Sequence, residues 1–67
     1  MKVKDLVNVT LATMPMEIWA YHGGEMEMLL KIFSLYFNGK LMVPEPIMEM
    51  EILVISINED GLNVEVK

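Results

Sequence analysis

The chain has 67 residues and a formal net charge of −5, with ten acidic residues, five lysines and no arginine. We expect one small domain over residues 1–67, and the acidic balance without arginine argues against direct binding to nucleic acid or to an anionic membrane surface. The absence of cysteine excludes disulfide bonds and thiolate zinc sites.

The amino-terminal third predicts a short helix followed by a strand. Val3–Val9 favours a two-turn helix that begins near Asp5, because its apolar residues fall on one side. Pro15 disfavours helix at the residue before it, so a connector follows the helix. Met16–Tyr21 alternates and contains aromatic and β-branched residues, which is typical of a strand. The paired glycines of His22–Gly24 then predict a turn, since glycine adopts positive φ readily.

The middle segment, residues 25–37, permits two interpretations. Its first four residues alternate as in a strand. Over the whole segment, however, polar residues recur at spacings of four, three and four, which places them on one face of a helix: Glu27, Lys31, Ser34 and Asn38. We therefore predict a central amphipathic helix from Glu25 to Phe37, ended by Asn38-Gly39, with a strand as the alternative.

The carboxy-terminal third predicts a β-hairpin. The two prolines of Leu41–Pro46 exclude the middle of a helix or of a central strand. Ile47–Ile57 is rich in β-forming residues, Asn58–Gly61 has the composition of a turn, and Leu62–Lys67 alternates cleanly. The predicted fold class is α+β, with a short amino-terminal helix, a central amphipathic helix and a small, mainly antiparallel sheet that ends in this hairpin.

Four stretches of the chain form a recognisable frame. They are VKDL at 3–6, EIWAY at 17–21, PEPIM at 44–48 and VISINEDGLNVEV at 54–66. This frame resembles short uncharacterised α+β proteins encoded in bacterial phages and prophages, and it covers the two ends of the chain better than the middle. The resemblance implies a phage accessory protein. None of its motifs is catalytic, so it implies no functional residues.

The apolar content predicts an interaction surface. Hydrophobic residues make up 54% of the chain and the mean hydropathy is +0.40, which is more than so small an interior can bury. A contiguous exposed apolar patch usually marks an interface, so we expect a homo-oligomer, most simply a homodimer, or a tight protein partner. The large side chains that could anchor this interface are Trp19, Tyr21, Phe33, Tyr36, Phe37, Met26, Met48 and Met50.

Catalytic chemistry finds little support in the sequence. The only histidine, His22, lies in a glycine-flanked turn, and no cysteine is present to act as a nucleophile. Paired glutamates such as Glu25 and Glu27 need a cleft to raise the pKa of one carboxyl. We expect a non-enzymatic protein without a cofactor.

Carboxylates support a second hypothesis. If Glu49 and Glu51 neighbour Glu65 across the sheet, the three side chains form an acidic face that attracts a basic groove. The protein would then be an acidic inhibitor or DNA mimic that acts on a host nuclease or DNA-binding protein.

Methionine supports a third hypothesis, because the chain contains eight of these residues. Thioether sulfur suits Cu(I), and the ligands of such a site would be Met26, Met28, Met48, Met50 and His22. Alternation of methionine with glutamate is also what a half-buried strand requires. We therefore predict no metal site and keep Cu(I) as an alternative.

Localisation is predicted from the absence of long apolar runs. No uninterrupted run approaches the roughly 18–20 residues that a membrane-spanning helix requires. Asp5 and Asn8 interrupt the segment that would serve as the core of an export signal. We expect a cytoplasmic protein that does not enter a membrane.

Overall fold

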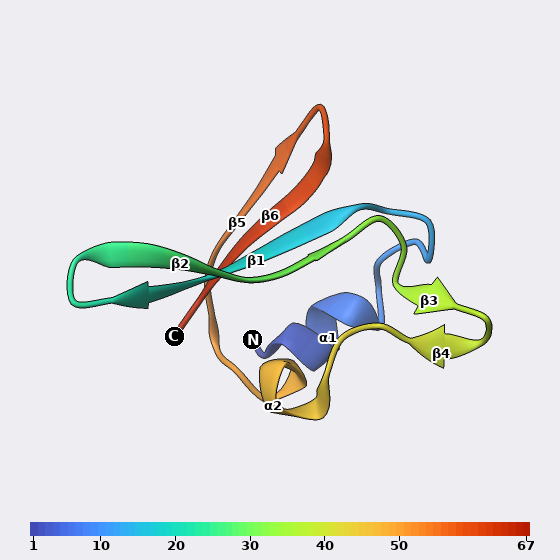
Figure 1. Cartoon of the computed structure of the whole chain (residues 1–67), viewed down its shortest axis with the longest axis horizontal. Coiled ribbons are helices and arrows are strands. Elements are labelled where there is room, and N and C mark those ends of the chain that lie inside the picture. Colours follow the sequence, from blue (N-terminus) through green and yellow to red (C-terminus); the bar gives the residue numbers. More distant parts are fainter.

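The main feature of the fold is a four-stranded sheet (Figure 1). A computed structural model describes all residues, 1–67. The strands are β1 Met16–His22, β2 Glu25–Ile32, β5 Ile52–Asn58 and β6 Gly61–Val66, and their spatial order is β2-β1-β6-β5. The pairs β1–β2 and β5–β6 are antiparallel, whereas the central pair β1–β6 is parallel. The sheet is therefore mixed, with two hairpins joined through their parallel inner strands.

Two short helices and a second, two-stranded sheet complete the α+β fold. Helix α1, Val3–Val7, packs under the main sheet, with α2, Glu45–Met48, beside it (Figure 1). Strands β3, Tyr36–Phe37, and β4, Lys40–Leu41, pair antiparallel. Neither helix has the length or the apolar content that crossing a membrane requires.

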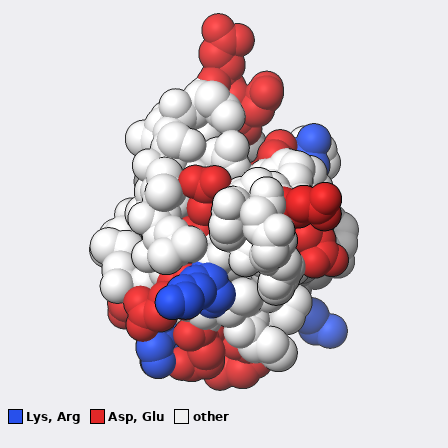
Figure 2. Space-filling model, turned by 90° about the vertical axis from the view of Figure 1, so that its left-hand side faces the viewer, with Lys and Arg blue, Asp and Glu red and all other residues white.

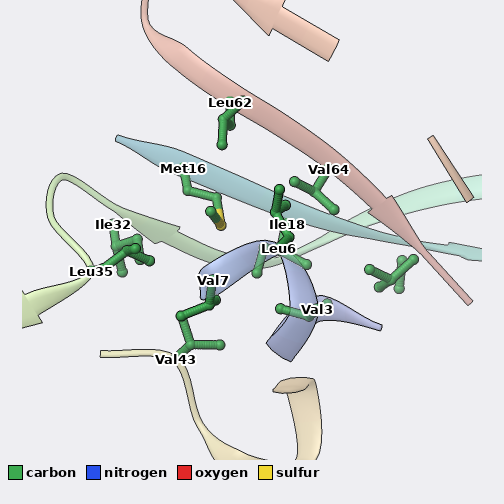
Figure 3. Packing of buried hydrophobic residues seen from close by; sticks show 12 residues of the cluster. Val3, Leu6, Val7, Met16, Ile18, Ile32, Leu35, Val43, Leu62 and Val64 are labelled. Carbon is green, nitrogen blue, oxygen red and sulfur yellow. The ribbon is translucent and has the colours of Figure 1, made fainter. Parts of the chain in front are cut away.

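The hydrophobic core lies between α1 and one face of the main sheet, here called the helix face. Alternation along β1 and β6 directs Met16, Ile18 and Ala20, and Leu62, Val64 and Val66, towards α1. Figure 3 shows the α1 side chains reaching these strands. The twelve buried hydrophobic residues are Val3, Leu6, Val7, Met16, Ile18, Ala20, Ile32, Leu35, Val43, Leu62, Val64 and Val66.

The opposite face of the main sheet, here called the open face, carries no helix. Trp19 and Tyr21 point to this side because they alternate with the buried residues of β1. Met28 pairs with Trp19, and Met26 pairs with Tyr21, so both methionines share the open face. Aromatic rings and thioethers thus lie next to one another on a surface that no other element of the chain covers.

The predicted central helix is wrong, because Glu25–Ile32 forms strand β2. Ile18 of β1 pairs with Leu30, but Trp19 pairs with Met28, so Leu29 is an extra residue in a β-bulge. A bulge shifts the phase of alternation. The two halves of β2 therefore place apolar residues at spacings that mimic a helix, and the local pattern misled the prediction.

The boundaries of two further elements also differ from prediction. The strand predicted to begin at Ile47 begins at Ile52, and the residues before it include α2. Proline near the start of α2 suits the first turn of a helix, and the Pro44 carbonyl accepts hydrogen bonds from the Ile47 and Met48 N–H groups, both at 3.1 Å. Helix α1 begins at Val3, before Asp5, where the Asp5 Oδ2 accepts the Lys2 N–H at 2.9 Å.

Candidate interaction surface

The chain exposes more large hydrophobic side chains than it buries in its core. Twelve hydrophobic residues form the core, whereas fourteen large ones are exposed: Met1, Val9, Leu11, Tyr21, Met26, Met28, Phe33, Tyr36, Phe37, Met42, Leu53, Val54, Ile55 and Ile57. Single exposed apolar residues are normal, but contiguous groups mark interaction sites. Three such contiguous groups lie on this surface, and each is described below with the strands that contribute its residues.

The first group lies on β5, which is an edge strand of the main sheet. Leu53, Val54, Ile55 and Ile57 are all exposed, and Ile57 is the most exposed at 77%. They occupy both faces of the strand, since Ile55 and Ile57 pair with Val64 and Leu62 of β6, whereas Val54 pairs with Glu65. No charged residue interrupts Ile52–Asn58. A continuous uncharged strip therefore runs along this edge.

The second group lies on the open face and consists of Trp19, Tyr21, Met26 and Met28. Trp19 is half-buried, and its Nε1 donates a hydrogen bond to Glu17 Oε1 at 3.1 Å. Tyr21, Met26 and Met28 are exposed. This group combines three of the predicted anchors, Trp19, Tyr21 and Met26, through the β1–β2 register.

The third group lies where β2 leaves the sheet. Phe33, Phe37 and Met42 line a shallow hollow of about 380 Å³ together with Lys31. The Lys31 Nζ lies 5.9 Å from the centre of the Phe33 ring, a cation–π distance. Both phenylalanines were predicted anchors, and both are exposed here.

The remaining predicted anchors are placed differently. Met48 and Met50 are half-buried and pack against the core. Tyr36 is exposed in β3, apart from the main sheet. The four apolar residues of β5 were missed by the sequence analysis. Their signal was available as a run of consecutive apolar residues where a strand with one wet face would alternate.

The three carboxylates of the predicted acidic face do not lie side by side in the sheet. Glu49 lies between α2 and β5, where its carboxylate accepts from Lys2 Nζ at 3.1 Å and from Lys4 Nζ at 3.3 Å. Glu51 forms an ion pair with the amino terminus at 3.4 Å, whereas Glu65 pairs with Trp19 and Val54 in the sheet. Figure 2 shows acidic side chains in several separate groups with uncharged surface between them.

The lysine pair changes the titration of Glu49. Hydrogen bonds from Lys2 and then Lys4, with the coulombic attraction of both, hold the pKa of the Glu49 carboxyl below its ordinary value. The hydrogen bond between the Lys2 ammonium and the Glu49 carboxylate also raises the pKa of Lys2. These exposed ion pairs tie the amino-terminal residues to the segment that leads into β5.

We expect the Glu49 carboxyl to titrate below an ordinary glutamate in an NMR pH titration. Because its folded-state pKa is lowered, its contribution to stability is present above the unfolded-state pKa and disappears as the pH falls through the lowered one. For Lys2 the sign is opposite, since its contribution is lost as the pH rises above its raised pKa. Salt near 1 M should shrink the Glu49 shift. An unshifted Glu49 at low salt would contradict the two lysine contacts.

The candidate Cu(I) ligands are divided between the two sides of the main sheet. Met26 and Met28 lie on the open face, whereas Met48 and Met50 pack against the core on the helix side. His22 Nε2 lies 3.6 Å from Glu27 Oε2. No group of three or more His, Asp or Glu side chains is placed to hold a metal ion. The five residues do not form one site in this structure.

The largest hollow lies at the start of β1, between Pro15 and the β5–β6 turn, and has a volume of about 420 Å³. Lys31 Nζ and Glu17 Oε2 stand 3.8 Å apart at its wall. No serine, histidine or cysteine lines this hollow.

No protein-family model, curated protein or solved structure matches this chain. The exposed apolar group on β5 comprises the consecutive residues Leu53, Val54 and Ile55 together with Ile57.

Proposed function

We propose that this protein is a non-enzymatic interaction module that acts as a homodimer. The observation that carries the proposal is the number of large exposed hydrophobic side chains, which exceeds that of the buried core. Bringing apolar surface out of water stabilises association by about 25 cal/mol per Å², before the cost of ordering two molecules. Closed two-fold dimers are the commonest way for identical chains to share such surface.

The setting of this module is a separate part of the proposal. The resemblance of the two ends of the chain to phage and prophage proteins favours an accessory role in such a genome. A dimer would present two copies of the open face, each with Trp19 and Tyr21, to a further protein. Aromatic side chains of this kind are frequent at the centres of protein interfaces.

Sedimentation equilibrium tests the self-association directly. Over concentrations from roughly 1 μM to roughly 1 mM, we expect the mass to rise from that of the 7.7 kDa chain to twice that value. The association should survive high salt, because apolar contacts are not screened as ion pairs are. A chain that remains monomeric throughout this range would overturn the proposal.

A further inference from the structure

We propose that the two copies associate through β5, with β5 of one copy paired antiparallel to β5 of the other. The two four-stranded sheets would join into one continuous sheet with both α1 helices on the same side. This inference rests on the proposed self-association and adds to it the strand, the direction and the symmetry of contact.

The backbone of β5 provides the first reason. One edge of the strand pairs with β6, and the other edge has no neighbouring strand. At its start the outer edge is closed, because the Ile52 N–H donates to the Met1 carbonyl at 2.8 Å and Lys2 bridges to Glu51. From Leu53 to Asn58 the edge is open, and the β5–β6 hairpin extends away from both helices (Figure 1). Unpaired N–H and C=O groups in a row are a template for another strand.

The side chains of β5 provide the second reason. Edge strands that stay single are usually protected by a lysine, a proline, a β-bulge or an inward-pointing charge. Leu53–Ile57 contains no charge and no proline, and its one bulge lies at its start, at Leu53. All its residues except Ser56 are apolar and exposed. A water-facing edge of this composition is stable in solution when another strand covers it.

The uncharged composition of β5 favours a second copy, in antiparallel orientation, as the occupant. With a two-fold axis at Ile55, the Ile55 residues of the two copies face each other and Val54 lies opposite Ser56, whereas Leu53 is the bulged residue at the start of the strand. With the axis at Ser56, Ile55 lies opposite Ile57. In both registers the pairs formed within residues 54–58 contain no charge, so apolar side chains face one another there.

The opposite edge of the sheet explains why pairing should end at a dimer. That edge is β2, which carries Glu25, Glu27 and Lys31. Pairing β5 of one copy with β2 of the next would place these charges against an apolar strand, and it would leave edges open for further addition. Pairing of β5 with β5 covers the apolar edge of both copies, so that the two edges of the joined sheet are the charged β2 strands.

Two matched substitutions test the inference by sedimentation. Ile57→Lys places a charge on the open edge at a side chain that contributes little to the monomer, since it is 77% exposed. Met28→Lys places the same charge on the open face and away from β5. We expect Ile57→Lys to raise the dimer dissociation constant at least tenfold, and Met28→Lys to change it less than threefold. Circular dichroism and the thermal midpoint report whether each variant is folded.

Single cysteines provide an independent measurement, because the natural chain has none. Opposed residues of antiparallel strands have Cα atoms about 4.5–5.5 Å apart, within the range of a disulfide. Ile55→Cys or Ser56→Cys, whichever lies at the two-fold axis, should form a disulfide-linked dimer under mild oxidation. Glu27→Cys on the β2 edge is exposed too and should form little.

The outcomes separate the two proposals. Loss of dimer in Ile57→Lys, together with rapid cross-linking at residue 55 or 56, supports the β5 contact. If Ile57→Lys does not fold, the cross-linking rates decide alone. Wild-type dimers that tolerate Ile57→Lys, or that cross-link no faster at 55 and 56 than at 27, overturn the β5 contact and leave self-association standing. A monomeric wild type overturns both.

Discussion

Replacing Leu35 with alanine is expected to lower the free energy of unfolding by about 2–5 kcal/mol. The Leu35 side chain is 0% exposed, although the residue belongs to no helix or strand. Its N–H donates to the Ala12 carbonyl at 2.8 Å, and its carbonyl accepts from the Met42 N–H at 2.7 Å. Figure 3 places it beside Ile32 in the core. The substitution therefore leaves a cavity in the core. The backbone around it is held in place by the hydrogen bonds to Ala12 and Met42, so it cannot easily move in to fill the cavity.

Urea denaturation of Leu35→Ala beside Phe33→Ala measures this effect. Phe33 lies two residues away but is 75% exposed, so its truncation should change the free energy of unfolding by less than about 0.5 kcal/mol. The experiment should be done at a concentration where the wild type is monomeric, so that only folding is measured. A domain of this size has a total stability of about 3–10 kcal/mol. A larger loss in Phe33→Ala than in Leu35→Ala would contradict the structure and favour the central helix.

Replacing Gly61 with alanine is expected to destabilise the fold by about 2–4 kcal/mol. Gly61 begins β6 with φ at +123°, a conformation that residues with a Cβ rarely adopt. A Cβ built there would overlap the Pro15 carbonyl, which accepts the Leu62 N–H at 2.9 Å. The substitution thus strains the turn of the β5–β6 hairpin and displaces the chain just before β1.

Gly24→Ala is the matched control for Gly61→Ala. Gly24 also has a positive φ, +88°, but a Cβ there meets nothing within 4 Å. Its replacement should therefore cost only the conformational strain, about 1–2 kcal/mol. Thermal unfolding of the two variants separates strain from steric overlap. Equal losses at both positions would show that the Pro15 carbonyl does not restrict residue 61.

The sequence and the structure agree where a short local pattern carries the information. The alternation of Leu62, Val64 and Val66 predicts an inward face for the last strand, and all three residues are buried. The paired glycines after β1 predict a turn, and both have positive φ. Local patterns of this kind depend on the direction in which successive side chains point, which the backbone sets by itself.

Residues 25–37 show where local patterns fail. The spacing of polar and apolar residues in this segment matched that of an amphipathic helix, because a bulge at Leu29 interrupts the alternation of β2. The bulge is visible only in the register against β1, so no inspection of the segment alone could have found it. The same holds for Leu35, whose burial depends on its contacts with Ala12 and Met42 rather than on a periodic face.

The amino-acid sequence alone sets the apolar content of the chain and predicts most elements at its two ends. It required that apolar side chains exceed the available interior, whatever the fold. Which of these side chains are exposed depends on the order of the strands in the sheet, and this order is a property of the folded chain. With β1 and β6 paired in the centre, the two least alike strands become the edges, the charged β2 on one side and the apolar β5 on the other. Pairing between distant segments is a non-local property, and it determines which strands lie at the edges of the sheet.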